Sequence, residues 1–486
     1  MRNREISTPL IIFECLTVNY ATRDCDACSP LIFTQLKSSQ FEGFSCSYSI
    51  IPTLLKQPIN RNYSGVLSPF AKTFALLHAD ALRYLEQSQS SHHNQIQKQL
   101  IQLGLLVPEN WKTPDIQQEI PTTLAAWLHL SDACNLNCAY CYLPHAKADM
   151  TLATGQAAID ATLRSALAHS YRAVKFKYAG GEPLLRFPLL LELHRYARQA
   201  TEQQNLALDG VVITNGTLLT AAMVEQLRAI GLRVTVSLDN LPASGLFSSQ
   251  AQRVYSNGND SAQQAIRGIE TALRGGMTPD ISITVSGRSV AQLPELLAWI
   301  LERDLPFSLN FYRDPSTALR MKEREDLQLK EAQFIKGMFA AYKVIEENLP
   351  RRSLLASLAD MANFAAPHLR RCSVGHSYLV FDTRGRVSKC QMQFDQPVSD
   401  IHSDDPLGAV RAAQHGIQNL TVDEKEGCQE CQWKYWCAGG CPLETYRQTG
   451  RYDLKSPHCA IYKALYPEAL RLEGLRLLKY AECQDR

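Results

Sequence analysis

The sequence predicts an α/β fold whose centre is a parallel sheet curved into a partial (β/α)6 TIM-like barrel. From Leu124 onwards, short apolar runs typical of strands alternate with amphipathic stretches that are long enough to be crossover helices. Six such units fall short of the eight that close a full barrel. The expected strands are residues 127–130, 174–178, 210–213, 233–238, 281–285 and 307–311, and helices are expected at 153–169 and 261–274.

Residues 1–120 are expected to form a separate module before the barrel. Residues 70–107 read as helical, with Asp80 as a helix N-cap and Gly104 as a helix stop. Two short helices followed by an apolar strand at 105–107 predict a winged-helix-like module. Residues 108–123 contain three prolines and read as a linker. The apolar positions at helical spacing are Leu82, Leu85, Ile96, Leu100 and Leu103.

The rest of the chain completes the expected domain order. A helix is expected at 331–348, and beyond Arg371 the sequence is rich in glycine and cysteine without long periodic elements. We therefore predict the N-terminal module at 1–120, the barrel at 121–335, a helical linker at 336–371 and a cysteine-rich domain at 372–486.

Composition excludes several classes of protein. Of the 486 residues, 45% are hydrophobic and 20% are charged, which argues against wholesale disorder. Fifty Lys and Arg against 48 Asp and Glu give a net charge of +2, too balanced to predict binding to nucleic acid or to an anionic membrane. No run of about 18 apolar residues is present to span a bilayer, so we expect a cytoplasmic protein.

The unusual feature of the composition is its 15 cysteines. An odd number cannot be paired completely in disulfides, and a reducing cytosol keeps thiols free. Clustered cysteines are then best explained as ligands of a metal ion or an iron-sulfur cluster. Cys134, Cys138 and Cys141 directly follow the first expected strand. Three thiolates on one loop can hold three irons of a 4Fe-4S cluster and leave the fourth open. A zinc site with His145 as the fourth ligand is the alternative.

Three further polar or glycine-rich segments follow the next expected strands. Gly180, Gly181 and Glu182 come after the second strand, Asn215 ends the third, and Ser237 and Asp239 end the fourth. The carboxyl ends of parallel strands share one edge of the sheet, which is the working edge of a barrel. Taken alone, each segment could be an ordinary turn.

Together these motifs resemble those of the radical S-adenosylmethionine (SAM) superfamily, in which three cysteines at this spacing follow the first barrel strand and an aromatic residue, here Tyr140, precedes the last of them. The resemblance implies a 4Fe-4S cluster whose open iron chelates SAM, and one-electron cleavage of SAM to methionine and a 5′-deoxyadenosyl radical. It also implies that Gly180, Gly181 and Glu182 bind the methionine amino group. Asn215, Ser237 and Asp239 would lie near the ribose and methionine. Arg253 is the recognisable arginine of the segment that follows, and Asn240 stands where the family usually has glycine.

A second array of seven cysteines lies between residues 372 and 459, and it exceeds the needs of a single tetrahedral zinc site. Its spacing, including Gly385 before Cys390, resembles the SPASM extension of radical SAM peptide-modifying enzymes. The resemblance implies one auxiliary 4Fe-4S cluster on Cys428, Cys431, Cys437 and Cys459. It implies another on Cys372, Cys390 and Cys441, with one iron left for another ligand. Two structural zinc ions are the alternative.

The resemblance therefore predicts a radical SAM maturase with three 4Fe-4S clusters that modifies a ribosomal precursor peptide, with an electron donor such as flavodoxin or ferredoxin. Expected products are thioether links, carbon-carbon crosslinks or excised backbone fragments. No catalytic side chain is identified. The N-terminal module resembles the peptide-recognition winged helices of such maturases.

Two alternatives to this function remain. A sulfatase-maturing enzyme would form formylglycine, but that group has an Asp base at the position of Gln391, and a neutral amide cannot accept the proton. A non-catalytic metal-binding assembly or adaptor protein would have no need for the polar segments at the strand ends.

The remaining cysteines and a histidine pair are less informative. The four N-terminal cysteines could either form a zinc site or remain unligated. Cys483 has no obvious partner. The histidine pair is most simply a solvated surface feature. These residues are Cys15, Cys25, Cys28 and Cys46, and His92 and His93.

Overall fold

The structure is a computed structural model that describes residues 11–13, 48–71, 74–87, 95–114, 121–143, 147–242, 251–314, 322–360 and 362–481. Its centre is a nine-stranded sheet in which six parallel strands follow one another in chain order. This confirms the predicted partial barrel. The six strands are β7 (Thr123–His129), β8 (Ala173–Ala179), β9 (Ala207–Thr214), β10 (Arg233–Ser237), β11 (Asp280–Val285) and β12 (Phe307–Phe311).

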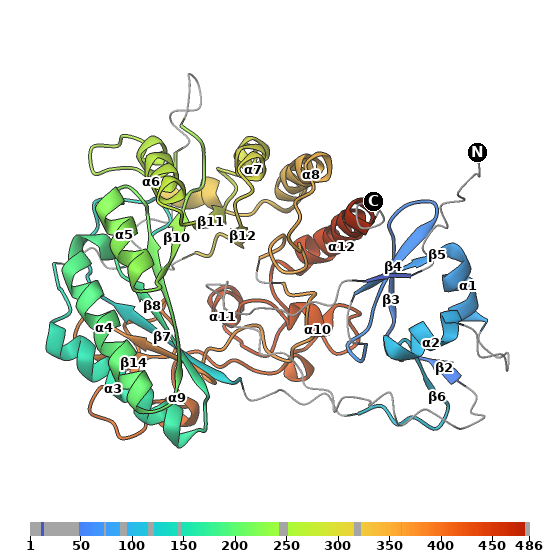
Figure 1. The fold of residues 1–486 in the computed structure, drawn as a ribbon, viewed down its shortest axis with the longest axis horizontal. Helices are drawn as coiled ribbons and strands as arrows, with labels where there is room; N and C mark the ends of the chain where they lie inside the picture. The colour runs from blue at the N-terminus through green and yellow to red at the C-terminus, as the bar shows by residue number, and fades with distance from the viewer. Residues whose placement is uncertain are drawn as a thin grey trace.

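A helix follows each of these strands, and Figure 1 shows the helices arranged along the outer side of the curved sheet. Alternate side chains explain this arrangement. In β8, Val174, Phe176 and Tyr178 join the core beneath the helices, whereas Lys175 and Lys177 point to the opposite face. The helices are α3 (Leu152–Ala168), α4 (Phe187–Gln203), α5 (Ala221–Ala229), α6 (Ala262–Arg274), α7 (Leu293–Glu302) and α8 (Glu331–Glu347), with a short η3 (Pro183–Arg186) before α4 and η6 (Lys322–Leu327) before α8.

The C-terminal region extends the barrel sheet, which the sequence did not predict. Strand β13 (Tyr378–Phe381) pairs in parallel with β7 at the edge opposite β12, and β14 (Arg386–Ser388) and β15 (Pro397–Asp400) continue the sheet antiparallel. The cysteine-rich region therefore lies directly against the first barrel strand.

The expectation that no long element occurs beyond Arg371 is wrong, because α12 (Cys459–Ala481) has 23 residues. Pro467 lies inside this helix and makes the sequence read as interrupted. The buried pair of Glu473 and Arg476, 2.8 Å apart, also hides the apolar face of the helix. The shorter elements of this region are α9 (Pro406–Ala412), η7 (Val422–Glu424), α10 (Lys434–Cys437) and α11 (Pro442–Thr449).

The N-terminal module contains two antiparallel sheets and two helices in the described residues. The sheet order β1-β5-β4-β3 is accompanied by a β2-β6 pair. Both predicted helices and the strand after them are present, but the helical start near residue 70 is wrong, since β5 occupies 75–78. The N-cap of α1 is His78, whose Nδ1 accepts from the backbone N–H of Asp80, so Asp80 lies in the first turn. Gly104 has the left-handed φ of +72° expected after a helix end. The elements are β1 (Ile11–Phe13), β2 (Tyr48–Ile50), β3 (Leu55–Pro58), β4 (Tyr63–Leu67), β5 (Ala75–His78), α1 (Ala79–Glu86), α2 (Gln95–Gln102) and β6 (Leu106–Pro108).

One face of the module's sheet packs against α12, which lies between the module and α8 (Figure 1). Leu55, Ile59 and Phe74 belong to the same apolar core as α12. The contact is close, because a Cβ on Gly474 would lie 2.5 Å from Ile59 Cδ1. The other face has its own core with α1 and α2. The module is therefore joined to the C-terminal region by packing as well as by the chain.

Within the described residues, no helix combines the length and the apolar character needed to cross a bilayer.

Candidate functional site

The loop after β7 brings the first three cysteines together at the carboxyl edge of the barrel. Residues 252–255 run beside this loop: Asn137 N donates to Val254 O at 2.7 Å and Ala139 N donates to Gln252 O at 2.9 Å. Burial raises the pKa of Cys138 to about 12, and the neighbouring Cys141 and Cys134 thiols raise it too. The charge on each neighbouring thiolate thus influences the pKa of Cys138.

Gly180 and Gly181 allow the second strand end to approach this loop closely. Gly181 N donates to Ser131 O at 2.7 Å, and a Cβ on Gly181 would lie 2.3 Å from Ala133 O. A Cβ on Gly180 would lie 2.6 Å from Ser131 O, and its φ of +154° is rarely adopted by other residues. Both glycines are required by the contact between the loop and β8.

Glu182 is fully buried and links three segments at this edge. Its Oε1 accepts from Leu184 N at 3.0 Å and from Thr214 Oγ1 at 2.7 Å, and its Oε2 accepts from Asn215 N at 2.8 Å. Burial raises the pKa of Glu182, while these hydrogen bonds lower it. The carboxylate therefore fixes the ends of β8 and β9 relative to one another.

Asn215 extends this network to the cysteine loop. Asn215 Nδ2 donates to Asn135 Oδ1 at 2.8 Å, and Asn135 Nδ2 donates to Thr217 Oγ1, also at 2.8 Å. Asn135 and Thr217 had no signal in the sequence beyond their position beside predicted site residues.

Tyr140, Asp239 and Arg253 meet beneath the loop. Tyr140 OH donates to Asp239 Oδ2 at 2.5 Å, and Arg253 Nη1 donates to the same hydroxyl. Arg253 Nη1 lies 3.8 Å from Asp239 Oδ2, and Asp239 Oδ1 accepts from Thr284 N at 2.8 Å. Burial raises the pKa of Asp239, and Arg253 opposes that rise. Nε of Arg253 is buried and has no hydrogen-bond partner among the described residues.

Ser237 and Asn240 flank Asp239 at the same edge. Ser237 is half-buried at the end of β10 and is in register with Ser282 of β11. Asn240, at the position where the resembled family usually has glycine, donates through Nδ2 to Asp260 Oδ2 at 3.0 Å and to Leu241 O at 2.9 Å. The asparagine side chain thus links the end of β10 to the segment before α6 by a hydrogen bond that a glycine could not form.

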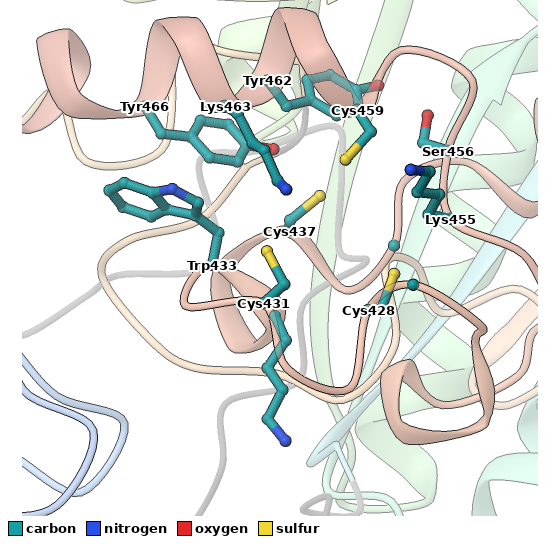
Figure 2. Close-up of a pocket in the computed structure, with 13 residues that line it drawn as sticks. Cys428, Cys431, Trp433, Cys437, Lys455, Ser456, Cys459, Tyr462, Lys463 and Tyr466 are labelled. Atoms are coloured by element: carbon teal, nitrogen blue, oxygen red, sulfur yellow. The ribbon is translucent and has the colours of Figure 1, made fainter.

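Four of the C-terminal cysteines line a single pocket, and Figure 2 shows their sulfur atoms around the same space. Cys437 is in α10 and Cys459 begins α12, so two separate helices bring these thiols together. Burial raises the pKa of Cys428 to about 12, with the Cys437 thiol adding to the rise and the Lys425 ammonium opposing it. The four cysteines are Cys428, Cys431, Cys437 and Cys459.

The other three C-terminal cysteines share an apolar cluster on the barrel side of this pocket. Cys372, Cys390 and Cys441 pack with Ala125 and Trp127 of β7. Burial raises the pKa of Cys390 to about 12, and the Cys441 thiol raises it further. Asn419 Nδ2 donates to the backbone oxygen of Cys372 at 2.6 Å and lies 3.6 Å from its Sγ.

Tyr142 is influenced by thiols of both the barrel loop and this second set. Burial raises the pKa of its phenol, and the thiols of Cys390 and Cys141 both add to the rise. The Arg313 guanidinium, which follows β12 at the same sheet edge, opposes them. Sequence reasoning missed both residues, although Tyr142 directly follows the last cysteine of the loop.

Two findings concern alternatives from the sequence. Among the described residues, no three or more His, Cys, Asp or Glu side chains are arranged to hold a single metal ion. His145, the expected fourth zinc ligand, lies outside the described residues, as do Cys483, His92 and His93 and the four N-terminal cysteines.

Comparison with known proteins identifies the barrel. The family model for the radical SAM superfamily matches residues 128–300. The serine-type anaerobic sulfatase-maturating enzyme of Klebsiella aerogenes is 24% identical over 332 residues, which cover 64% of this chain and 78% of that protein. The AdoMet-dependent heme synthase of Methanosarcina barkeri is 24% identical over 360 residues, covering 70% of this chain and 96% of that protein.

A solved structure titled native anSMEcpe with bound AdoMet and Cp18Cys peptide has the same fold, with a TM-score of 0.57 and 19% identity, over 74% of this chain and 99% of that one. The superfamily implies SAM and a 4Fe-4S cluster as cofactors, and three thiols on one loop match the donor set such a cluster requires. Residues 128–300 therefore form a radical SAM domain, and the relatives indicate that the chain is an enzyme.

Proposed function

We propose that this enzyme is a SPASM-type maturase that modifies a ribosomal precursor peptide. The observation that carries the proposal is the gathering of ten cysteines, far apart in the sequence, into three neighbouring sets. The thiols of Cys141 in the first set and Cys390 in the second both raise the pKa of Tyr142, and residues 437–441 join the second set to the third along the chain. The three sets are Cys134, Cys138 and Cys141; Cys372, Cys390 and Cys441; and Cys428, Cys431, Cys437 and Cys459.

In this proposal, the first set holds the cluster that binds SAM and the other two sets hold auxiliary 4Fe-4S clusters. When bound, the barrel cluster and SAM supply a 5′-deoxyadenosyl radical that removes hydrogen from the peptide, and the auxiliary clusters supply an acceptor for the electron released. An external one-electron donor such as flavodoxin or ferredoxin completes the system.

The chain's own residues would position SAM at the loop. The backbone of Gly180 and Gly181 approaches it closely, and Glu182 fixes the adjoining strand ends, where the methionine amino group would bind. Asn215, Ser237 and Asp239 present polar atoms along the same edge for the ribose and methionine. Arg253, with its unpartnered Nε, provides positive charge beneath the loop.

A peptide substrate is supported by the relatives. The solved structure named above contains a peptide, and the Klebsiella protein is named as a sulfatase-maturating enzyme. The N-terminal module provides a place for a remote part of a precursor, because in the described residues β3 ends the sheet order and pairs only with β4. An edge strand can accept an extended peptide as a further strand, which would raise the effective concentration of the reactive segment.

The test is mass spectrometry of a precursor peptide after anaerobic reaction with the reconstituted enzyme, SAM and a reductant. The candidate precursor is a short Cys-rich or aromatic-rich peptide encoded beside the gene. We expect a product that has lost two hydrogens or a backbone fragment, and no product from Cys134→Ala. A sulfatase peptide with a Cys or Ser at the modified position is the competing substrate. Formylglycine on that peptide, with the precursor unchanged, would favour the sulfatase-maturing alternative despite the neutral Gln391.

A further inference from the structure

The stretch from Cys437 to Cys441 joins two of the thiol sets. Cys437 lines the pocket in Figure 2, whereas Cys441 belongs to the apolar cluster beside β7. The three residues between them are all left-handed, with φ of 47° at Ala438, 76° at Gly439 and 74° at Gly440. A non-glycine residue in this conformation is uncommon, so the turn is held by its surroundings.

Lys425 is the side chain packed directly against this turn. Its Nζ donates to Ala438 O at 2.8 Å, and a Cβ on Gly439 would lie 2.4 Å from Lys425 Cδ and 3.0 Å from its Nζ. Lys425 is only 1% exposed. The missing side chain at Gly439 therefore makes room for a buried ammonium between the two thiol sets.

The charge of this ammonium needs an explanation. Removing an ammonium from water costs several kcal/mol unless an opposite charge compensates it, and one backbone carbonyl does not supply that charge. Within the described part of the chain, Lys425 forms no ion pair with a carboxylate. Burial lowers its pKa, and the groups that oppose this change are thiols of both sets, namely Cys428, Cys437, Cys372 and Cys441.

Two other buried cations nearby are compensated differently. Arg371 is fully buried and donates to Cys437 O at 3.2 Å, but its Nη2 lies 3.7 Å from the carboxylate of Asp360. Lys389, which precedes Cys390, is also buried, but its Nζ donates to Ala413 O at 2.7 Å and Ile417 O at 3.1 Å. Burial lowers the pKa of Lys389, and no thiol is among the groups that oppose this change. Lys389 is thus a matched control for Lys425.

We propose that Lys425 sets the reduction potentials of both auxiliary clusters, by placing one buried positive charge between them. The inference rests on the proposed function, because it requires clusters on both sets. A 4Fe-4S cluster with thiolate ligands is negatively charged, and each electron it accepts adds to that charge. A cation held nearby in a low-dielectric interior favours the reduced form. Loss of the cation should therefore shift both potentials to more negative values.

The test is a redox titration monitored by electron paramagnetic resonance, using full-length protein with reconstituted clusters. We expect Lys425→Met to shift both auxiliary potentials negatively and to leave the barrel cluster unchanged, since the thiols that oppose the change in the pKa of Lys425 belong to the two auxiliary sets. Lys389→Met removes the same charge from a buried site and should shift neither auxiliary potential appreciably. Unshifted auxiliary potentials in Lys425→Met, or equal shifts in the two variants, would overturn the proposal.

Iron content separates the effect of charge from that of packing. If Lys425→Met loses auxiliary irons while Lys425→Arg retains them, the positive charge is needed and the proposal is supported. If both variants lose the same irons, Lys425 acts by packing under Gly439, and the proposal is wrong. If the wild-type protein holds only about four irons, the auxiliary clusters are absent, and both the proposed function and this inference are wrong. Wild-type protein with three clusters and an unshifted Lys425→Met would overturn only the role of Lys425.

Discussion

Replacing Cys134, Cys138 or Cys141 with alanine is expected to reduce formation of 5′-deoxyadenosine from SAM to background. The three thiols lie on one loop that is held by Gly181, Glu182 and residues 252–255, and no other cysteine in the described residues lies on that loop. Removing one of the three ligands would cause loss of the barrel cluster, and with it the open iron at which SAM would bind. The measurement is chromatographic quantification of 5′-deoxyadenosine after reduction with dithionite.

The control for these variants is the iron that remains. Because the other seven cysteines form separate sets, each variant should retain about eight irons and a wild-type circular dichroism spectrum. A variant that retains wild-type cleavage of SAM would show that the loop is not the cluster site.

The second large effect separates the roles of the three sets. Cys428→Ala or Cys437→Ala should abolish formation of the modified peptide but keep cleavage of SAM within about tenfold of wild type, a change of about 1.4 kcal/mol in the barrier. The pocket of Figure 2 is built by α10, α12 and the loop before them, and it shares no lining residue with the barrel loop. Peptide product and 5′-deoxyadenosine are measured in the same reaction.

The control for this prediction is the comparison of the barrel variants with the pocket variants. Barrel variants should lose both products, whereas pocket variants should lose only the modified peptide. Full peptide modification by Cys428→Ala would show that the pocket is not needed for the reaction. Loss of SAM cleavage to background in a folded Cys428→Ala protein would contradict the separation of roles.

The barrel was predictable because most of its strands carry an apolar residue at every second position, as β8, β11 and β12 do, and each strand is followed by a stretch long enough for a crossover helix. The strand expected at 307–311 has those same bounds as β12, and the strand expected at 281–285 differs from β11 by one residue. Strand β13 was missed because it has only four residues and its parallel partner, β7, is remote in sequence. Strands β3 to β5 are short, and Gly65 weakens the pattern of β4.

The candidate site was predictable where a motif follows a strand, and unpredictable where the contact is between distant segments. Because Glu182, Asn215 and Asp239 each follow a parallel strand, their positions at the carboxyl edge could be predicted from the order of the sequence alone. No local pattern in the sequence indicates that Tyr140 donates a hydrogen bond to Asp239, which lies 99 residues away. The same is true of Lys425, whose place between two thiol sets arises only from the turn at Ala438 and Gly439.

The central claim is that three sets of cysteines hold three 4Fe-4S clusters. The most direct test is metal and acid-labile sulfide analysis of full-length protein after anaerobic reconstitution, with Mössbauer spectroscopy to identify the cluster type. We predict about twelve irons per chain, all in cubane clusters. Stoichiometric zinc with negligible iron would contradict the account, because a zinc protein cannot supply the electron that cleaves SAM.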